Sequence, residues 1–240
     1  GCRLEPIRSH DGLIRIGEEM DRFNSGASAA SMNFDSEQRT PEEERMTLQP
    51  AGAMTDRLRF RMIVPAFPAF NIYSRVASRM TALGPLSVAT VVSRMDGWHV
   101  EVIDENNYRR FGPKDARGLP DHGTLQTIRG VEVVGLYGGL SSTIPRLFEL
   151  AGFYKQQGVT TIAGGQHFTG EHIRHGLENG IDYVVLGEGE DTIRELLAAI
   201  RDERPPEDVA GIAFLRDGEV VQTPARPPIT NFDRDRNSVV

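Results

Sequence analysis

The fold is decided by the segment Val131-Glu132-Val133-Val134-Gly135-Leu136-Tyr137-Gly138-Gly139-Leu140-Ser141-Ser142-Thr143. Its first seven residues are apolar nearly throughout, which is typical of a strand covered on both faces of a sheet. Glycines and hydroxyl residues follow at once, and apolar residues then recur at helical spacing along one face. These apolar residues are Ile144, Leu147, Phe148, Ala151 and Tyr154. A strand, a tight turn and an amphipathic helix, in that order, form the repeating unit of a parallel α/β sheet.

The same alternation extends in both directions from this segment. Ser142 or Thr143 is expected to cap the following helix, with Pro145 in its first turn. The pattern predicts an α/β fold with a Rossmann-like or flavodoxin-like, doubly wound, five-stranded parallel sheet. We interpret residues 108–126, which carry Gly, Pro and charge, as a long surface connection. The expected strands are 60–64, 99–103, 131–137, 159–163 and 183–186, and the expected helices are 86–95, 144–154, 173–177 and 191–200.

The two ends of the chain differ from its middle. Asp217-Gly218 is a hairpin turn signal between short apolar runs, so we expect a carboxy-terminal β-hairpin. Residues 1–55 show no sustained period, which is typical of a flexible or poorly structured leader. We therefore divide the chain into that leader, an α/β domain over 56–204, and a hairpin with a linker over 205–240. Because the first residue is Gly rather than Met, we interpret the sequence as a fragment or a processed chain.

Composition excludes several classes of protein. The net charge of −7 argues against a general nucleic-acid binder, which normally carries a basic stripe. Cys2 is the single cysteine, so one chain can form neither a disulfide framework nor a three-cysteine iron–sulfur site. No apolar run approaches the roughly 18 residues of a membrane-spanning helix. We therefore expect no nucleic-acid or membrane partner, and a cytoplasmic location.

Glycine and small polar residues gather where the predicted strands end. The carboxyl ends of parallel strands meet at one edge, where ligands bind, and this edge would collect the segments 65–73, 137–143, 164–169 and 187–190. Glycine lets a ligand approach the backbone closely, because it has no Cβ. Any one such loop is explained by the need for a tight turn. Three of them at one edge indicate a binding site.

Over residues 60–229 the sequence resembles the cobalamin-binding domain of methionine synthase and, more closely, the amino-terminal domain of cobalamin-dependent radical-SAM proteins. In the wider family a Ser-x-Leu element ends the third strand and Gly-Gly ends the fourth. Tyr137-Gly138-Gly139 and Gly164-Gly165 occupy these positions here, with the family's separation. The phrases similar to the radical-SAM branch are Leu83-Gly84-Pro85-Leu86-Ser87, Val102-Ile103-Asp104-Glu105-Asn106, Ile162-Ala163-Gly164-Gly165-Gln166-His167 and Gly187-Glu188-Gly189-Glu190.

The resemblance implies that cobalamin is the cofactor and that its nucleotide tail runs between these loops. It also implies a radical-SAM barrel, in cis or in trans, as the partner. The iron–sulfur cluster and S-adenosylmethionine would belong to that barrel, which this chain lacks, so we expect no catalytic residue and no metal ligand here. The expected cofactor-binding residues are Tyr137, Gly138, Gly139, Leu140, Ser141, Ser142, Thr143, Gly164, Gly165, Gln166, His167, Gly187, Glu188 and Gly189.

Two departures from the family pattern change this expectation. Tyr137 and Gly139 stand where the family has Ser and Leu, so the hydroxyl contact to the tail would come from a residue of 141–143 instead. In the methionine synthase type, a histidine in the loop after the first strand binds cobalt. The corresponding loop here, residues 65–73, contains no histidine. We therefore expect base-off cobalamin with no protein histidine on cobalt, its lower face shielded by Phe67, Phe70 or Tyr73.

Other functions remain as alternatives. The first is a flavodoxin-like interaction domain that has no ligand and only docks a partner. The second is a hydrolytic site of Glu188, Glu190 and His167, although the two glutamates are better explained as caps of the following helix. The histidines at 167, 172 and 175 are weak candidates for a metal site. Asp104 resembles the ribose-binding acid of dinucleotide folds, but no Gly-x-Gly-x-x-Gly loop follows the first strand.

Overall fold

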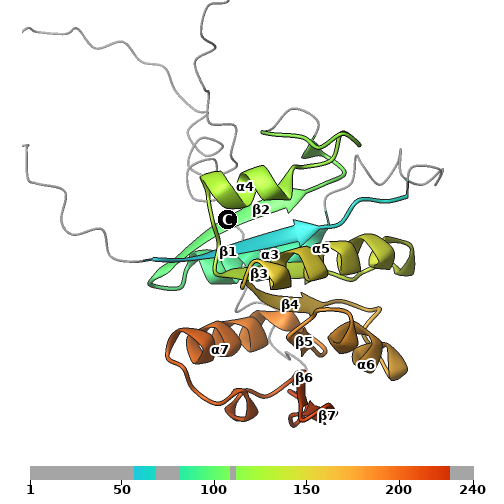
Figure 1. The fold of residues 1–240 in the computed structure, drawn as a ribbon. Coiled ribbons are helices and arrows are strands. Elements are labelled where there is room, and N and C mark those ends of the chain that lie inside the picture. The colour runs from blue at the N-terminus through green and yellow to red at the C-terminus, as the bar shows by residue number, and fades with distance from the viewer. Residues whose placement is uncertain (1–56, 69–81, 109–111, 228–240) are drawn as a thin grey trace, which may run out of the picture.

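The computed structural model describes residues 57–68, 82–108 and 112–227, so the predicted leader over 1–55 lies outside the described residues. The strands and helices alternate along the chain, as the pattern predicted (Figure 1). In chain order the elements are β1 (Leu58–Val64), α3 (Leu83–Ser93), β2 (Trp98–Asp104), α4 (His122–Ile128), β3 (Val133–Tyr137), the 3-10 turn η3 (Ser141–Thr143), α5 (Ile144–Gln156), β4 (Thr160–Gly164), α6 (Glu171–Glu178), β5 (Tyr183–Val185), α7 (Gly189–Arg201), η4 (Pro206–Asp208), β6 (Ile212–Arg216) and β7 (Glu219–Gln222).

All the strands join one sheet in the order β2-β1-β3-β4-β5-β6-β7. The first five are parallel, and their order 2-1-3-4-5 is that of flavodoxin-like folds. The predicted α/β fold with a carboxy-terminal hairpin is therefore confirmed. The hairpin extends the sheet, because β6 pairs with β5 in the antiparallel sense. Asp217 and Gly218 form its turn with φ values of 52° and 81°, as a two-residue hairpin loop requires.

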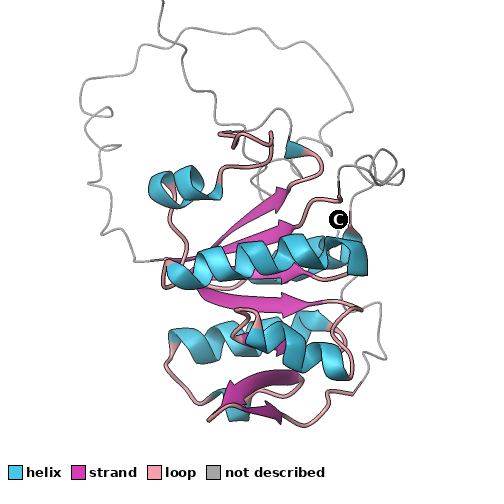
Figure 2. Ribbon diagram, turned by 45° about the vertical axis from the view of Figure 1, so that its right-hand side comes forward, coloured by secondary structure: helices cyan, strands magenta, loops and turns pink. Residues whose placement is uncertain are grey.

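Helices cover both faces of the sheet and enclose two separate cores (Figure 2). Side chains alternate along β1, so Phe60 and Met62 enter the core beneath α3 and α7, whereas Ile63 enters the core beneath α4, α5 and α6. Arg61 also points to the second side, where it contacts Tyr154 of α5. Within the described part of the chain, no helix is both long and apolar enough to span a membrane.

Two local predictions were wrong. The connection over 108–126 leads into helix α4, whose N-cap Asp121 accepts a hydrogen bond from Thr124 N at 3.0 Å. Asp is a preferred N-cap residue and therefore a signal for the start of a helix. The prediction missed it because it relied on the Gly, Pro and charge content of the segment. The second error concerns Thr143, which stands at the N-cap of α5 but makes no capping hydrogen bond. Because η3 already holds Thr143 in a helical conformation, its hydroxyl donates to Leu140 O at 2.9 Å instead.

Candidate cofactor site

A cavity of about 260 Å³ lies between the sheet and the two helices α3 and α7. It opens at the carboxyl ends of the parallel strands, near the topological switch point between β1 and β3, where the strand order of the sheet reverses. In open α/β sheets ligands bind at this edge. The fold therefore places a cavity where a cofactor is expected.

The outer part of the cavity is formed by strand ends and by the first turns of the two helices. One cross-strand row runs from Tyr137 through Gly164 to Val185. Gly84 of α3 faces this row, because a Cβ added to it would lie 3.8 Å from the ring of Tyr137. The remaining outer residues are Pro85, Leu136, Ala163, Gly165, Gly187, Glu188, Gly189 and Glu190.

The inner part of the cavity lies further toward the amino ends of the strands. There a second cross-strand row joins Met62, Gly135 and Ile162. Phe60 lies two residues deeper on β1, and Ile193 of α7 closes the side opposite the sheet. Val88 of α3 lines the cavity at the level where the outer part meets the inner part. Every side chain in the inner part is apolar.

Gly135 is the residue on which the inner space depends. A Cβ at this position would lie 2.6 Å from Cζ of Phe60 and 3.1 Å from Cε of Met62. Contacts this short would push the Phe60 ring or the Met62 methyl group into the open volume. Glycine in the middle of a strand otherwise weakens it, so its presence here marks a site where another group comes close.

The glycines of the β3 and β4 loops pack the two loops against each other. Gly138 N donates to Gly164 O at 2.7 Å, and His167 N donates to Gly138 O at 3.0 Å. Gly165 has a φ of +122°, and a Cβ on it would lie 2.6 Å from Gly138 O. Gly165 is therefore required for the fold of the edge itself, apart from any contact with a ligand.

The structure brings together only part of the predicted binding set in the cavity wall. Gly187, Glu188 and Gly189 line it from the β5 loop, and Tyr137, Gly164 and Gly165 line it from β3 and β4. The other predicted residues lie in the adjoining loops at the same edge and do not line it. These are Gly138, Gly139, Leu140, Ser141, Ser142, Thr143, Gln166 and His167.

Sequence reasoning missed the inner wall. Phe60, Met62, Gly135, Ile162 and Ile193 were assigned to strands and helices without a binding role. The available signal was Gly135, which interrupts an otherwise apolar strand of branched residues. The side of the sheet that it faces depends on strand pleat and register, so the signal did not reveal which other residues share the cavity.

The carboxylates at the β5 loop are arranged differently from the expected helix caps. Glu188 stands at the N-cap of α7 but makes no capping hydrogen bond with its side chain. Glu190 lies in the first turn, where its Oε1 accepts a hydrogen bond from Ser87 Oγ of α3 at 2.7 Å. This contact ties the two covering helices together at the mouth of the cavity. Both glutamates stand at the amino end of α7, as predicted, where negative charge suits the helix dipole. A capping hydrogen bond from the Glu188 side chain is not formed, and the Glu190 side chain bonds a neighbouring helix instead.

The histidines at this edge contact aromatic rings and one another and are not arranged as a set of metal ligands. The rings of His167 and His172 stack at 4.5 Å between centroids, and burial together with the neighbouring His172 lowers the pKa of His167. Nδ1 of His167 lies 3.2 Å from Ser141 Oγ. His175 contacts the ring of Phe148 instead. Among the residues that the structure describes, no three His, Cys, Asp or Glu side chains are arranged to hold a metal ion.

Two large apolar side chains are exposed at the mouth. Leu140, in the β3 loop, is 55% exposed, and Leu83, at the start of α3 beside Gly84, is 78% exposed. Exposed leucines are individually unremarkable, but these two stand at the same edge as the cavity. They offer apolar contacts to a broad ring placed over the strand ends.

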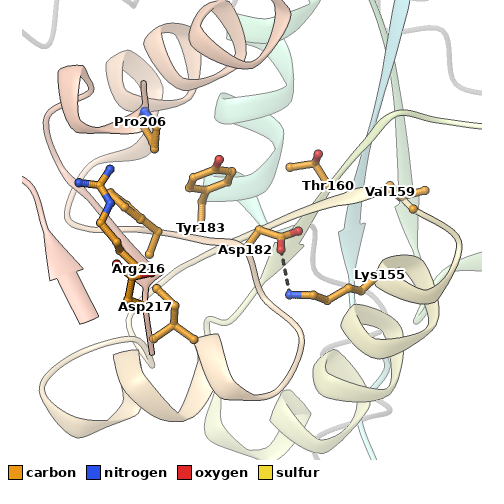
Figure 3. Close-up of a pocket in the computed structure, with 11 residues that line it drawn as sticks. Lys155, Val159, Thr160, Asp182, Tyr183, Pro206, Arg216 and Asp217 are labelled. Carbon is orange, nitrogen blue, oxygen red and sulfur yellow. Dashed lines mark hydrogen bonds and ion pairs between the residues drawn. The ribbon is translucent and has the colours of Figure 1, made fainter. Parts of the chain in front are cut away.

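A second hollow, of about 690 Å³, lies at the opposite end of the sheet (Figure 3). It is lined from the amino ends of β4 and β5 and from the β6–β7 turn, and Lys155 and Asp182 form an ion pair of 2.9 Å across its wall. It is larger than the first cavity but more open and more polar. Because it lies away from the carboxyl edge, we do not assign the cofactor to it.

The exit of β1 is held in place from the other face of the sheet. Ala66 N donates to Glu105 Oε2 at 2.8 Å, and Phe67 N donates to Asn106 Oδ1 at 2.9 Å. Asp104 accepts a hydrogen bond from Asn106 N and so closes the β2 turn. Phe70 and Tyr73, which the sequence suggested as shields of a lower cofactor face, lie outside the described residues.

Glu105 belongs to a buried chain of hydrogen bonds. Arg61 Nη1 donates to the Tyr154 hydroxyl at 2.8 Å, that hydroxyl is hydrogen-bonded to Nδ1 of His122 at 2.7 Å, and Nε2 of His122 donates to Glu105 at 3.1 Å. Arg146 Nη2 pairs with the same carboxylate at 2.6 Å. Burial alone would raise the pKa of Glu105, but hydrogen bonds from His122 and Arg146 lower it to about 2.

The residues of the cavity fit the nucleotide tail of cobalamin. The inner wall is apolar, and Gly135 lets the side chains of Phe60 and Met62 pack close against β3, which keeps the cavity open for a flat aromatic base. The glycine-rich mouth lets a sugar–phosphate arm pass close to the backbone. The exposed leucines suit the hydrocarbon parts of a corrin ring. This agreement rests on the shape and the chemistry of the wall.

Comparisons with known proteins agree with this assignment. Residues 72–197, just over half of the 240-residue chain, match the model of the family described as B12 binding domain. Two curated relatives, anaerobic magnesium-protoporphyrin IX monomethyl ester cyclases, are each 41% identical over short regions. The enzyme of Synechocystis sp. matches over 56 residues (23% of this chain and 11% of its own length), and that of Rubrivivax gelatinosus over 81 residues (32% and 15%).

Two solved structures with a similar fold are radical S-adenosylmethionine enzymes with cobalamin bound. The radical S-adenosylmethionine methyltransferase TsrM from Kitasatospora setae, with cobalamin and a [4Fe-4S] cluster bound, gives a TM-score of 0.53 at 18% identity. The cobalamin-dependent S-adenosylmethionine radical enzyme OxsB, with aqua-cobalamin bound, gives 0.55 at 16% identity. The matches cover 73% and 72% of this chain but only 30% and 23% of those chains. The family match over more than half of the sequence shows that this protein belongs to the B12-binding domain family, which confirms the resemblance seen in the sequence.

Proposed function

We propose that this chain holds cobalamin in the base-off form, as the cofactor module of a radical-SAM protein of the methyltransferase type. The observation that carries the proposal is the apolar cavity beneath α3 and α7, with Gly135 at its inner end and glycine-rich loops at its mouth. A base that enters this cavity is withdrawn from cobalt. The location and the lining of the space support the base-off form.

Different residues of the carboxyl edge would contact different parts of the cofactor. Gly164, Gly165, Gly187 and Gly189 let the nucleotide arm pass close to the backbone, and Tyr137 flanks it at the end of β3. The hydroxyl groups and loop residues outside the wall face the corrin side chains and the mouth. This second group is Gly138, Gly139, Leu140, Ser141, Ser142, Thr143, Gln166 and His167, whereas Glu188 lines the wall itself.

We further propose that no histidine of the chain binds cobalt. The loop after β1 is where the methionine synthase type supplies its histidine, and residues 65–73 contain none. His167 follows β4 and contacts Ser141 and His172 instead. When bound, cobalamin supplies a cobalt centre that can accept and transfer a methyl group. The chain binds the cofactor, orients it and excludes water from its base.

The reaction itself would require a radical-SAM barrel, in cis or in trans. The fold matches are to enzymes in which the similar region makes up less than a third of the chain. The iron–sulfur cluster and S-adenosylmethionine would be bound by that barrel, and this module alone would catalyse nothing. The cytoplasmic location expected from the sequence is part of the same proposal.

Titration with hydroxocobalamin tests the proposal. We expect a change in the visible spectrum on binding, a pink colour that survives desalting, and a spectrum of the base-off type. The electron paramagnetic resonance spectrum of the bound cob(II)alamin form should show no nitrogen superhyperfine splitting, because neither the base nor a histidine binds cobalt. Splitting that persists would contradict the base-off, histidine-free part of the proposal and leave cobalamin binding itself intact.

A pair of glycine variants localises the site. Gly135→Ala should weaken cobalamin binding at least about tenfold, because the displaced Phe60 ring fills the cavity. Gly152→Ala on α5 is the matched control, since a Cβ there meets nothing within 4 Å. A folded wild-type chain that retains no cobalamin would instead favour the ligand-free docking domain.

A further inference from the structure

We infer that the cavity discriminates between cobamides by their lower base, accepting an apolar aromatic base such as dimethylbenzimidazole and rejecting a purine such as adenine. The inference rests on the proposed function, because it concerns the base in that cavity. It goes further by naming which members of the cobamide class the protein takes. The argument depends on how polarity is distributed along the depth of the cavity.

Strand register fixes the order of the wall residues from mouth to inner end. Tyr137, Gly164 and Val185 form the row nearest the carboxyl edge, and Met62, Gly135 and Ile162 form the next row inward. Helix α7 begins at the same edge, so Ile193 lies about one turn further in than Gly189 and Glu190. A base that enters at the carboxyl edge therefore meets the side chains of Phe60 and Met62, which pack over Gly135, with its leading ring.

The polar groups of the wall are confined to the mouth. Glu188 and Glu190 lie at the start of α7, and Glu190 already accepts a hydrogen bond from Ser87. At the inner end the side chains are Phe60, Met62, Ile162 and Ile193, and Gly135 has none. The backbone of β1, β3 and β4 at this depth is engaged in the parallel ladders. Only the thioether of Met62 remains, and it is a weak acceptor.

The two kinds of base differ at their leading edge. Dimethylbenzimidazole presents a benzene ring with two methyl groups, which transfer favourably to an apolar wall. Adenine presents ring nitrogens and an amino group, and each of these loses its hydrogen bonds to water without finding a partner. A site built for an apolar group rejects such a ligand through the desolvation of its polar atoms. The inner wall thus selects by polarity.

The test compares three cobamides on the same wild-type protein: cobalamin, adeninylcobamide, and cobinamide, which has no base. Cobalamin should bind at least about tenfold more tightly than adeninylcobamide, which corresponds to about 1.4 kcal/mol. Cobinamide should also bind more weakly than cobalamin, because it leaves the cavity unfilled. Dissociation constants from visible spectra and from equilibrium dialysis provide the measurement.

The outcomes distinguish failure of the base selectivity from failure of cobalamin binding itself. Equal affinity for cobalamin and adeninylcobamide would overturn the selectivity while cobalamin binding stands. Cobinamide that binds as tightly as cobalamin would show that the base does not use the cavity, and would also overturn it. If none of the three cobamides is retained, the proposed function fails and the inference fails with it.

A substitution at the inner end provides a second readout. Ile162→Thr places a hydroxyl group beside Gly135, where it can accept a hydrogen bond from the amino group of adenine. The ratio of the dissociation constants of adeninylcobamide and cobalamin should therefore fall at least about threefold. Ile63→Thr, on the opposite face of the sheet and equally buried, is the control and should leave the preference unchanged. The ratio of two affinities within one variant does not depend on how much of it is folded. An unchanged ratio in Ile162→Thr contradicts the inference.

Discussion

Beneath α3 and α7 the sheet is apolar, contains glycine and encloses open space, whereas beneath α4 and α5 it carries charged side chains that are buried and hydrogen-bonded. Gly135 and Arg61 mark the contrast, since they occupy neighbouring strands and face opposite sides. One face keeps room for a ligand. The other is filled by Arg61, Tyr154, His122 and Glu105, all at most 6% exposed.

The difference shows how one face of a sheet can be held rigidly while the other face keeps space for a ligand. Buried charges are tolerated only in well-defined hydrogen-bond geometry, so the network holds β1, β2, α4 and α5 in fixed relation. Open apolar space costs stability, because its walls lack contacts, and here it can be offset by a bound ligand. We expect that damage to the network mainly affects folding, and that damage to the cavity mainly affects binding. Three variants test this separation.

Arg61→Met should produce the largest effect. Arg61 is fully buried, and it donates to Glu101 at 2.5 Å, to Tyr154 and to Arg129 O. Its removal leaves the Glu101 carboxylate without its main partner, so the free energy of unfolding should fall by about 4 kcal/mol. Urea denaturation measures the change.

The double variant Arg61→Met/Glu101→Leu is the control for that prediction. It removes both members of the ion pair and should lose clearly less stability than the single variant, because no buried carboxylate is left unpaired and Arg129, the other partner of Glu101, is partly exposed to water. Where the protein is folded, cobalamin affinity should match the wild type in both variants. A fall in affinity would show that the two faces are coupled.

Glu105→Gln should have an intermediate effect that depends on pH. The folded state lowers the pKa of Glu105 from an ordinary 4.5 to about 2, despite the opposing effect of burial. The ionised carboxylate therefore stabilises the folded state by on the order of 3 kcal/mol. That stability is fully present above about pH 4.5 and is lost as the pH falls toward 2.

The measurement is the difference in unfolding free energy between wild type and Glu105→Gln across this range. The difference should be largest near neutral pH and shrink as the pH falls below 4.5. A difference that stays constant with pH would mean that ionised Glu105 contributes nothing specific.

Leu140→Ser should have the smallest effect and should act on binding. Leu140 is exposed at the mouth, where it can cover part of the corrin ring, so its loss should weaken cobalamin binding about threefold. Stability should not change, because the side chain makes little contact in the absence of ligand. Leu215→Ser, on β6 and 37% exposed, is the control and should leave binding unaltered. Equal effects of both variants would argue against a role of Leu140 at the cofactor.

Much of the fold was predictable because its signals are local. The alternation of apolar strands and amphipathic helices indicated a parallel sheet, and Asp217-Gly218 indicated the hairpin. Helix α4 was not predicted, because its start signal, Asp121 with Thr124, lies in a segment rich in Gly, Pro and charged residues. The loops that carry the predicted binding residues do meet at one edge. Whether those residues contact the cofactor remains a prediction.

By itself the sequence determined the order of strands and helices, the small-residue loops at the strand ends and the membership of the B12-binding family. Only the tertiary structure decided that Gly135 and Ile162 share a cavity with Ile193, and that Arg61, inside an apolar strand, is matched by Glu101 and Tyr154. The reason is that turns and periodicity act between near neighbours. Cavities and buried ion pairs join residues far apart in the chain, and their position depends on register and pleat.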